Sequence, residues 1–148
     1  MNLQSINRRN SQGFTLIELM MVVAVISILI TVAIPGISSA KRRANEAAAI
    51  TALRTISQAE SQYRVRFGTF TDVPTLEISG LLDENFEDAQ KSGYAFQNAG
   101  TSTNGTWAVT ANPVDPGISG NRYFFIDASG VIRFNDSGNA TATDATIQ

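Results

Sequence analysis

The first third of the chain opens with a long apolar run. Residues 19–40 carry no charged side chain, and the first part of this stretch reads LMMVVAVISILITVAI. About 20 apolar residues in a helix are long enough to cross the hydrocarbon core of a bilayer. The pattern therefore predicts a membrane-spanning helix from Phe14 to Ile34, within a transmembrane segment of residues 14–40.

Beyond this run the apolar residues recur at spacings of three and four. The spacing predicts an amphipathic helix over residues 41–67, with a stripe made of Ala49, Leu53, Ile56, Ala59, Tyr63 and Phe67. Charged residues, Glu60 among them, lie off this stripe on the polar side. Gly68 predicts the end of the helix. Pro35 removes one hydrogen bond within the helix, so we expect a kink there and not an end.

After residue 93 the apolar residues alternate with polar ones, with a period of two. Four segments predict strands: Tyr94–Asn98, Thr106–Ala111, Arg122–Asp127 and Val131–Asn135. Asp127 to Gly130 predicts a hairpin turn, because Gly130 can take a positive φ. Several aromatic residues of these segments are expected in the core and not on a binding platform: Trp107, Tyr123, Phe125 and Phe134.

The predicted fold class is α+β. A long N-terminal helix spans the membrane with its first half and packs on a small antiparallel β-sheet with its second half. Residues 1–13 are expected to be a leader, and residues 41–148 to form a globular head. Within the head, the expected parts after the helix are an αβ connection, a sheet and a loosely ordered tail: residues 68–93, 94–136 and 137–148.

Composition removes several classes of function. The chain has no Cys and no His, so it lacks a thiolate nucleophile, the commonest general base and the commonest transition-metal ligand. A net charge of -2 does not supply the clustered cations that nucleic-acid binding needs. Aspartates in the C-terminal turns have no regular calcium-ligand spacing. We therefore expect no enzyme, no catalytic residue, no cofactor, no metal and no direct contact with nucleic acid.

The pattern alone leaves two interpretations of the N-terminal region open. In one, Arg8 and Arg9 precede the apolar core of a secretory signal peptide, and cleavage near Ala40 releases an exported soluble domain. In the other, the apolar helix is kept and only a leader before Phe14 is lost. Sequencing of the mature N-terminus would separate these interpretations.

Glu18 bears on this choice because it places a carboxylate at the start of the apolar run. A charge at bilayer depth costs roughly 2.5–3.5 kcal/mol, so it needs a partner. Glu18 either lies at the interface and reaches the headgroups, or it pairs with a cation that processing creates. A cut after Gly13 would create such a cation, the α-amino group of Phe14, in the same chain or in a staggered neighbour.

The residues Gly-Phe-Thr-Leu-Ile-Glu at 13–18, preceded by a short basic leader and followed by an apolar helix, resemble the N-terminus of type IV pilins and of the pseudopilins of type II secretion. The resemblance covers roughly residues 8–40. It implies that a membrane prepilin peptidase cuts between Gly13 and Phe14 and that Phe14 becomes N-methylated. It further implies that Glu18 neutralises a neighbour's amine during assembly and that Pro35 is the helix-kinking proline.

The resemblance also implies a function. The chain is expected to be a single-pass precursor in the inner membrane, with a cytoplasmic N-terminus, that polymerises into a helical filament of identical subunits. Ala24, Ser27 and Thr31 are small residues that let such helices approach closely. The implied partners are the prepilin peptidase and methylase, an inner-membrane assembly platform and minor pilins.

We expect a type IV pilin in an extracellular fibre for adhesion, motility or DNA uptake. The alternative within the same family is a pseudopilin that forms a periplasmic piston.

Overall fold

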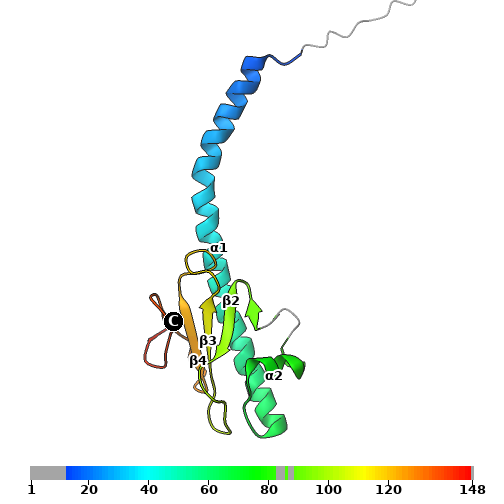
Figure 1. Ribbon diagram of the computed structural model, residues 1–148, viewed down its shortest axis with the longest axis vertical. Coiled ribbons are helices and arrows are strands. Elements are labelled where there is room, and N and C mark those ends of the chain that lie inside the picture. Colours follow the sequence, from blue (N-terminus) through cyan, green and yellow to red (C-terminus); the bar gives the residue numbers. More distant parts are fainter. Residues whose placement is uncertain (1–12, 83–85, 87–88, 148) are drawn as a thin grey trace, which may run out of the picture. The chain divides into compact units, whose positions relative to one another are not determined.

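A computed structural model describes residues 13–82, 86 and 89–147 (Figure 1). The chain divides into two compact units, Met1–Ile37 and Ser38–Gln148. The elements follow in the order α1 (Leu16–Phe67), α2 (Val73–Ile78), β1 (Gln90–Lys91), β2 (Tyr94–Asn98), β3 (Ala108–Pro113), β4 (Tyr123–Asp127), β5 (Arg133–Asn135) and β6 (Ala145–Thr146). The predicted α+β class is confirmed.

Helix α1 ends where the sequence predicts. Gly68 follows its last residue with φ +78°, and the Gly68 N–H donates to the carbonyl of Arg64 at 2.8 Å. A left-handed residue after the last turn closes a helix in this way, and glycine takes that conformation without a Cβ penalty. The other end differs by two residues from the prediction, because the helix begins at Leu16 and not at Phe14.

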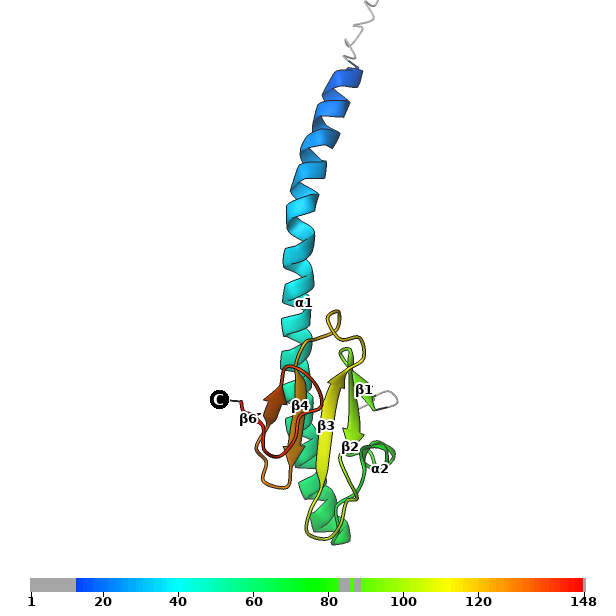
Figure 2. The same cartoon turned by 60° about the vertical axis from the view of Figure 1, so that its left-hand side comes forward.

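The six strands form one antiparallel sheet in the order β1-β2-β3-β4-β5-β6, a simple meander (Figure 2). The four predicted strands correspond to β2–β5, and the bounds of β2 agree fully. Gly130 closes the predicted turn between β4 and β5 with φ 73°, and its N–H donates to the Asp127 carbonyl at 2.9 Å. Strand β5 starts at Arg133, two residues later than predicted.

The sheet extends beyond the predicted limits at both edges. Strand β1 lies in the segment predicted to be a connection, which also contains the short helix α2. Strand β6 lies in the segment predicted to be a loosely ordered tail, and that prediction is wrong. Arg133 Nη1 donates to the Asp144 carbonyl at 3.0 Å, and the Ile147 N–H donates to the Ile132 carbonyl at 3.0 Å. These bonds, with the β5–β6 pairing, hold the tail on the sheet.

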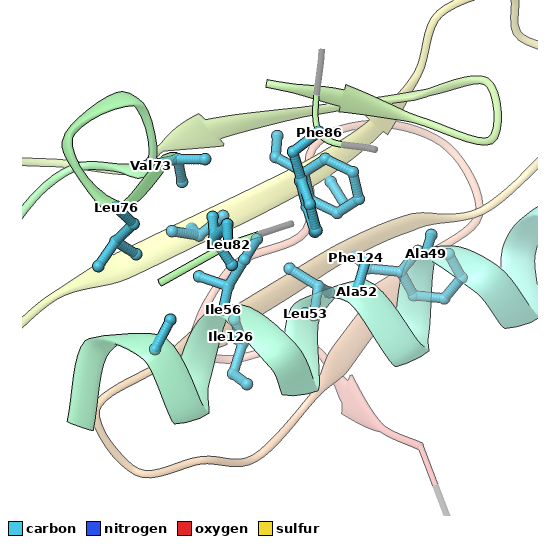
Figure 3. Close-up of a cluster of buried hydrophobic side chains, with 14 of the residues drawn as sticks. Ala49, Ala52, Leu53, Ile56, Val73, Leu76, Leu82, Phe86, Phe124 and Ile126 are labelled. Atoms are coloured by element: carbon cyan, nitrogen blue, oxygen red, sulfur yellow. The ribbon is translucent and has the colours of Figure 1, made fainter. Parts of the chain in front are cut away.

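The core of the second unit lies between α1 and the sheet (Figure 3). From the helix, Figure 3 shows Ala49, Ala52, Leu53 and Ile56 facing the sheet and the connection. Their partners in the same cluster include Val73, Leu76, Leu82, Phe86, Phe124 and Ile126. Burial of each large aliphatic or aromatic side chain contributes about 1.5–3 kcal/mol, so this cluster is the main force that joins helix and sheet.

The predicted apolar stripe is right over most of its length and wrong at its end. Phe67 is 52% exposed, and its ring stacks on Tyr63 with centroids 4.4 Å apart. Glu60, predicted on the polar side, is fully buried. Phe67 is the last residue of α1 and is not part of the buried core cluster. Glu60 lies four residues after Ile56 and three before Tyr63, so it is on the apolar face and not the polar side, and the Thr71 N–H of the αβ connection donates to its carboxylate there at 3.1 Å.

The predicted core aromatics divide into two groups. Trp107 and Phe125 are buried, whereas Tyr123 and Phe134 are half-buried. Phe124 is fully buried, and it shares strand β4 with Phe125. Because neighbouring strand residues point to opposite faces of a sheet, burial of both shows that each face of β4 is covered.

Candidate functional site

The residues predicted to be processed lie just before α1. Phe14 exposes 85% of its surface, and neither Gly13 nor Phe14 is part of the helix. A Cβ placed on Gly13 meets no heavy atom within 4 Å, and the backbone there is not in the left-handed region. The described fold therefore does not require glycine at position 13.

Thr15 and Glu18 cap the first turn of α1 reciprocally. The Thr15 N–H and hydroxyl donate to Glu18 Oε2 at 2.9 and 2.7 Å, and the Glu18 N–H donates back to Thr15 Oγ1 at 3.3 Å. The Thr15 carbonyl accepts the first helical bond, from the Leu19 N–H at 3.3 Å. This is the capping-box arrangement, in which the side chains at the two ends of the first turn satisfy each other's backbone donors.

The sequence prediction for Glu18 missed the part that Thr15 plays. The structure provides the carboxylate with partners inside its own chain, in addition to the amine that processing would create. The signal was present in the sequence, since Thr-x-x-Glu directly before an apolar run is the spacing of a capping box. A carboxylate at the first turn also lies near the positive end of the helix dipole, which stabilises it.

The apolar side chains that follow this cap have no cover in the described chain. Every residue from Leu16 to Thr31 is exposed. Among the described residues, α1 is the one helix long and apolar enough to cross a membrane, and none of its most apolar part is buried. A contiguous apolar surface of this extent needs lipid or another protein against it.

Two hydroxyls within this apolar surface are satisfied by the helix itself. Ser27 Oγ donates to the Val23 carbonyl at 2.7 Å, and Thr31 Oγ1 donates to the Ser27 carbonyl at 2.9 Å. A hydroxyl paired in this way carries no free donor into an apolar medium. Ala24, Ser27 and Thr31 therefore present small side chains without the cost of an unsatisfied polar group.

The predicted kink at Pro35 stays a prediction. The helix assignment of α1 continues through position 35, while the side chains of residues 32–35 lie outside the described residues.

Glu46 joins the start of the head's helix to the two residues that precede strand β4. Its carboxylate accepts from Arg122 Nε at 2.8 Å and from the Asn121 N–H at 3.0 Å. Burial of Glu46 acts to raise its pKa, but these two hydrogen bonds and the Arg122 charge outweigh it, and the net pKa is lowered. The pair of Glu46 and Arg122 thus links helix and sheet within the second unit.

Two of the aspartates in the C-terminal turns accept hydrogen bonds within their own turns. Asp127 Oδ1 accepts from the Ser129 N–H at 2.9 Å, and Asp144 Oδ2 accepts from the Thr141 N–H at 2.7 Å. In the described part of the chain, no three His, Cys, Asp or Glu residues gather in a way that could hold a metal ion. These carboxylates shape loops.

Comparison with known proteins finds a family model and a relative that match this chain. Residues 8–34 match the model of the prokaryotic N-terminal methylation motif. The match includes Gly13, Phe14 and Glu18 and most of the apolar run. It thus covers the capped start of α1 and the exposed apolar surface together.

A relative matches over a longer stretch. The chain is 38% identical over 71 residues to the type IV wide pilus major component PilA4 of Thermus thermophilus. The aligned part is 48% of this chain and 54% of the relative, so the chain spans about half the length of the curated relative that it matches.

Proposed function

We propose that the chain is a type IV pilin, a structural subunit of a type IV pilus, because residues 8–34 match the methylation motif and 71 residues are 38% identical to a pilus major component. The observation that carries the proposal is the methylation motif joined to a helix whose apolar side chains are exposed from Leu16 to Thr31. The family is structural and not enzymatic, so the subunit needs no catalytic centre. Its apolar helix supplies the means of assembly.

Processing removes the leader, residues 1–13. A prepilin peptidase cuts between Gly13 and Phe14, and the same maturation methylates the new amino group of Phe14. The exposure of Phe14 and the absence of any fold requirement for Gly13 support this assignment. Both residues lie outside the helix, where an extended segment can enter a protease site.

Before assembly the subunit resides in the inner membrane. Residues 14–40 cross the bilayer once with the N-terminus in the cytoplasm, and residues 41–148 form the head on the other side. The length and apolar character of α1 support the span. The cytoplasmic N-terminus follows from the short leader, which is easier to retain than the long C-terminal part.

Assembly exchanges lipid for neighbouring helices. Exposure of apolar surface to water costs roughly 25 cal/mol per Å², so the helix can leave the membrane only into a packed bundle of sister helices. Ala24, Ser27 and Thr31 allow close approach, and the hydroxyls of Ser27 and Thr31 are already satisfied. Head-to-tail addition that does not close produces a fibre.

Glu18 sets the register of addition. Its carboxylate attracts the methylated amine of Phe14 in a neighbouring subunit, because an unpaired charge in an apolar filament core is strongly disfavoured. The Thr15 cap supports this role, since it fixes the carboxylate at the first turn of the helix before a neighbour arrives. The remaining partners are the assembly platform and minor pilins, and no direct contact with nucleic acid is proposed.

The description of the relative as a pilus major component favours a pilus over a pseudopilus. The match to residues 8–34 favours a retained helix over a signal peptide cut near Ala40. Adhesion, motility and DNA uptake are the roles that such a fibre serves, and a deletion strain scored for each separates them.

Electron microscopy of fibres sheared from cells, followed by mass spectrometry of the subunit, tests the proposal. The expected result is a fibre made of a chain that begins with N-methylated Phe14. A processed chain that stays in the cell envelope without surface fibres would favour the pseudopilin. A soluble monomer that begins at Lys41 would overturn both assignments.

A further inference from the structure

A groove of about 490 Å³ lies beside the last turns of α1. One wall is the face of the helix that carries Ser61 and Val65, four residues apart, and the aromatic side chains of Phe70 and Trp107 form the other side. Val65 is 90% exposed. Arg64 also lines the groove, with its guanidinium 4.9 Å from the centroid of the Phe70 ring. The groove is therefore partly apolar and carries a cation.

The loop between β3 and β4 has a complementary character. Ile118 is 72% exposed, and Val114 is also exposed. The loop is well ordered, because the Ile118 and Ser119 N–H groups donate to the Asp115 carbonyl at 3.0 and 2.9 Å. Within the part of the chain that the structure describes, no group donates a hydrogen bond to the Asp115 carboxylate. The loop thus presents an apolar tip beside an anion that the described residues leave unpaired.

The loop and the groove lie at opposite ends of the head. Arg42 Nη1 donates to the Gly117 carbonyl at 3.1 Å, and Asn45 Nδ2 donates to the Ser119 carbonyl at 2.8 Å, which fixes the loop beside the start of the head's helix. Val65 marks the groove near the end of that helix. The stretch from Asn45 to Val65 spans about 30 Å at 1.5 Å per residue. Figures 1 and 2 both show this loop and the end of α1 at opposite ends of the sheet domain.

We propose that the β3–β4 loop of one subunit docks in the α1 groove of another subunit, with Ile118 against Val65 and Trp107 and with Asp115 facing Arg64. This inference rests on the proposed function, because it takes a second copy of the chain as the occupant. Charge complementarity selects that occupant, since the exposed apolar tip and its anion match the apolar wall and its cation.

The contact is heterologous when the linked subunits point the same way along the fibre, as the proposed function has them. A loop and a groove about 30 Å apart on one head cannot meet within the same subunit, so in such a parallel array each docking event leaves a free loop at one end and a free groove at the other. A contact of this kind does not close on itself and continues as a fibre. It adds a head-to-head link to the packing of the apolar helices, with an axial offset of about 30 Å between the linked subunits.

Disulfide cross-linking in assembled fibres tests the contact. The chain contains no native Cys, so the double variant Ile118→Cys/Val65→Cys carries the only thiols of the subunit. Mild oxidation of sheared fibres should convert the monomer band on a non-reducing gel into a ladder of dimers and longer multimers. Each single variant should stop at monomer, because one thiol per subunit has no partner across the contact.

Ile118→Cys/Ile78→Cys is the matched control. Ile78 is as exposed as Val65, at 88%, but it lies on α2 and does not line the groove. The control should stay monomeric under the same oxidation. Fibres of normal appearance that give no ladder from the Val65 pair, or an equal ladder from the Ile78 pair, would overturn the docking and leave the proposed function intact. Failure of the wild-type chain to form fibres would overturn both.

A charge exchange gives a second readout that does not depend on cysteine. Arg64→Glu should reduce the yield of sheared fibres, and the further change Asp115→Arg should restore it, because the pair is then present with reversed signs. Circular dichroism and subunit abundance check that each variant folds. Equal yields for Arg64→Glu and the wild type would count against the contact.

Discussion

Thr15 and Glu18 hold each other at the first turn of α1 through three hydrogen bonds: two donated by Thr15 to the carboxylate and one donated by the Glu18 N–H to the Thr15 hydroxyl. The bonds satisfy backbone donors that no helical partner reaches. Glu18 therefore has a structural role in one subunit, and this role has to be separated from any role between subunits.

Two substitutions at Glu18 make that separation. Glu18→Gln keeps a side chain that can complete a capping box but removes the charge, whereas Glu18→Ala removes both. If charge pairing drives assembly, both variants should enter the membrane and be processed, yet yield few fibres by electron microscopy. Normal fibre yield from Glu18→Gln would show that the cap, and not the charge, is what assembly needs.

Gly13 should be required for processing and not for folding. Gly13→Val should leave an unprocessed precursor, visible as a slower band on a denaturing gel, because a bulky residue before the cut obstructs the peptidase. Gly105→Val is the matched control, since a Cβ at Gly105 also meets no heavy atom within 4 Å. The control should be processed normally. A mature band from Gly13→Val would mean that the cut lies elsewhere.

Glu60 should make the head less stable as the pH rises. Burial raises the pKa of Glu60 to about 7, the Thr71 N–H that donates to it at 3.1 Å opposes this rise, and the nearby Asp72 adds to it. The other carboxylate oxygen of Glu60 is buried without a hydrogen-bond partner in the described chain. Between about pH 4.5 and 7 the folded state keeps a proton that the unfolded state has released, so the free energy of unfolding falls across this window.

The fluorescence of Trp107, the single Trp of the chain, can follow this effect in detergent-solubilised protein. The expected loss is on the order of 3 kcal/mol between the two ends of the window. Glu60→Gln should abolish this dependence. Glu46→Gln is the control: the pKa of Glu46 is lowered, so its contribution is present above the ordinary Glu pKa and is lost as the pH falls through its own folded pKa. A slope that survives in Glu60→Gln would assign the effect to another group.

Gly120 should not tolerate a side chain. A Cβ at this position would overlap the Tyr94 hydroxyl and stand 2.6 Å from its Cζ. Tyr94 is fully buried and its hydroxyl donates to the Arg122 carbonyl at 2.9 Å, so the ring has no room to withdraw. Gly120→Ala should lower the free energy of unfolding by about 1–3 kcal/mol, measured by denaturant titration. Gly138→Ala, where a Cβ has open space, should be close to neutral.

Features that depend only on residues adjacent in the sequence could be predicted. The apolar run, the residues at 13–18 and the alternation over Tyr94–Asn98 each lie in one continuous segment. Their physical signals are hydropathy, spacing and strand period, which need no knowledge of distant contacts. Gly68 and Gly130 belong to the same group, because their positive φ values close local turns.

Two-residue strands have no period that a sequence can show, so β1 and β6 could not be predicted. They exist because longer strands beside them offer unpaired backbone groups. The groove near Val65 and the Ile118 loop likewise have no local signature, since each combines residues far apart in the chain.

The sequence alone predicted the apolar membrane helix, the motif before it and the α+β class, because each rests on local chemistry. The tertiary structure decided which polar residues became interior ones. Glu46 and Glu60 are charged side chains on α1, a type that normally stays in solvent, yet each is covered by a segment that arrives from elsewhere in the chain. Burial depends on what folds over a residue, and that depends on distant contacts that no local pattern encodes.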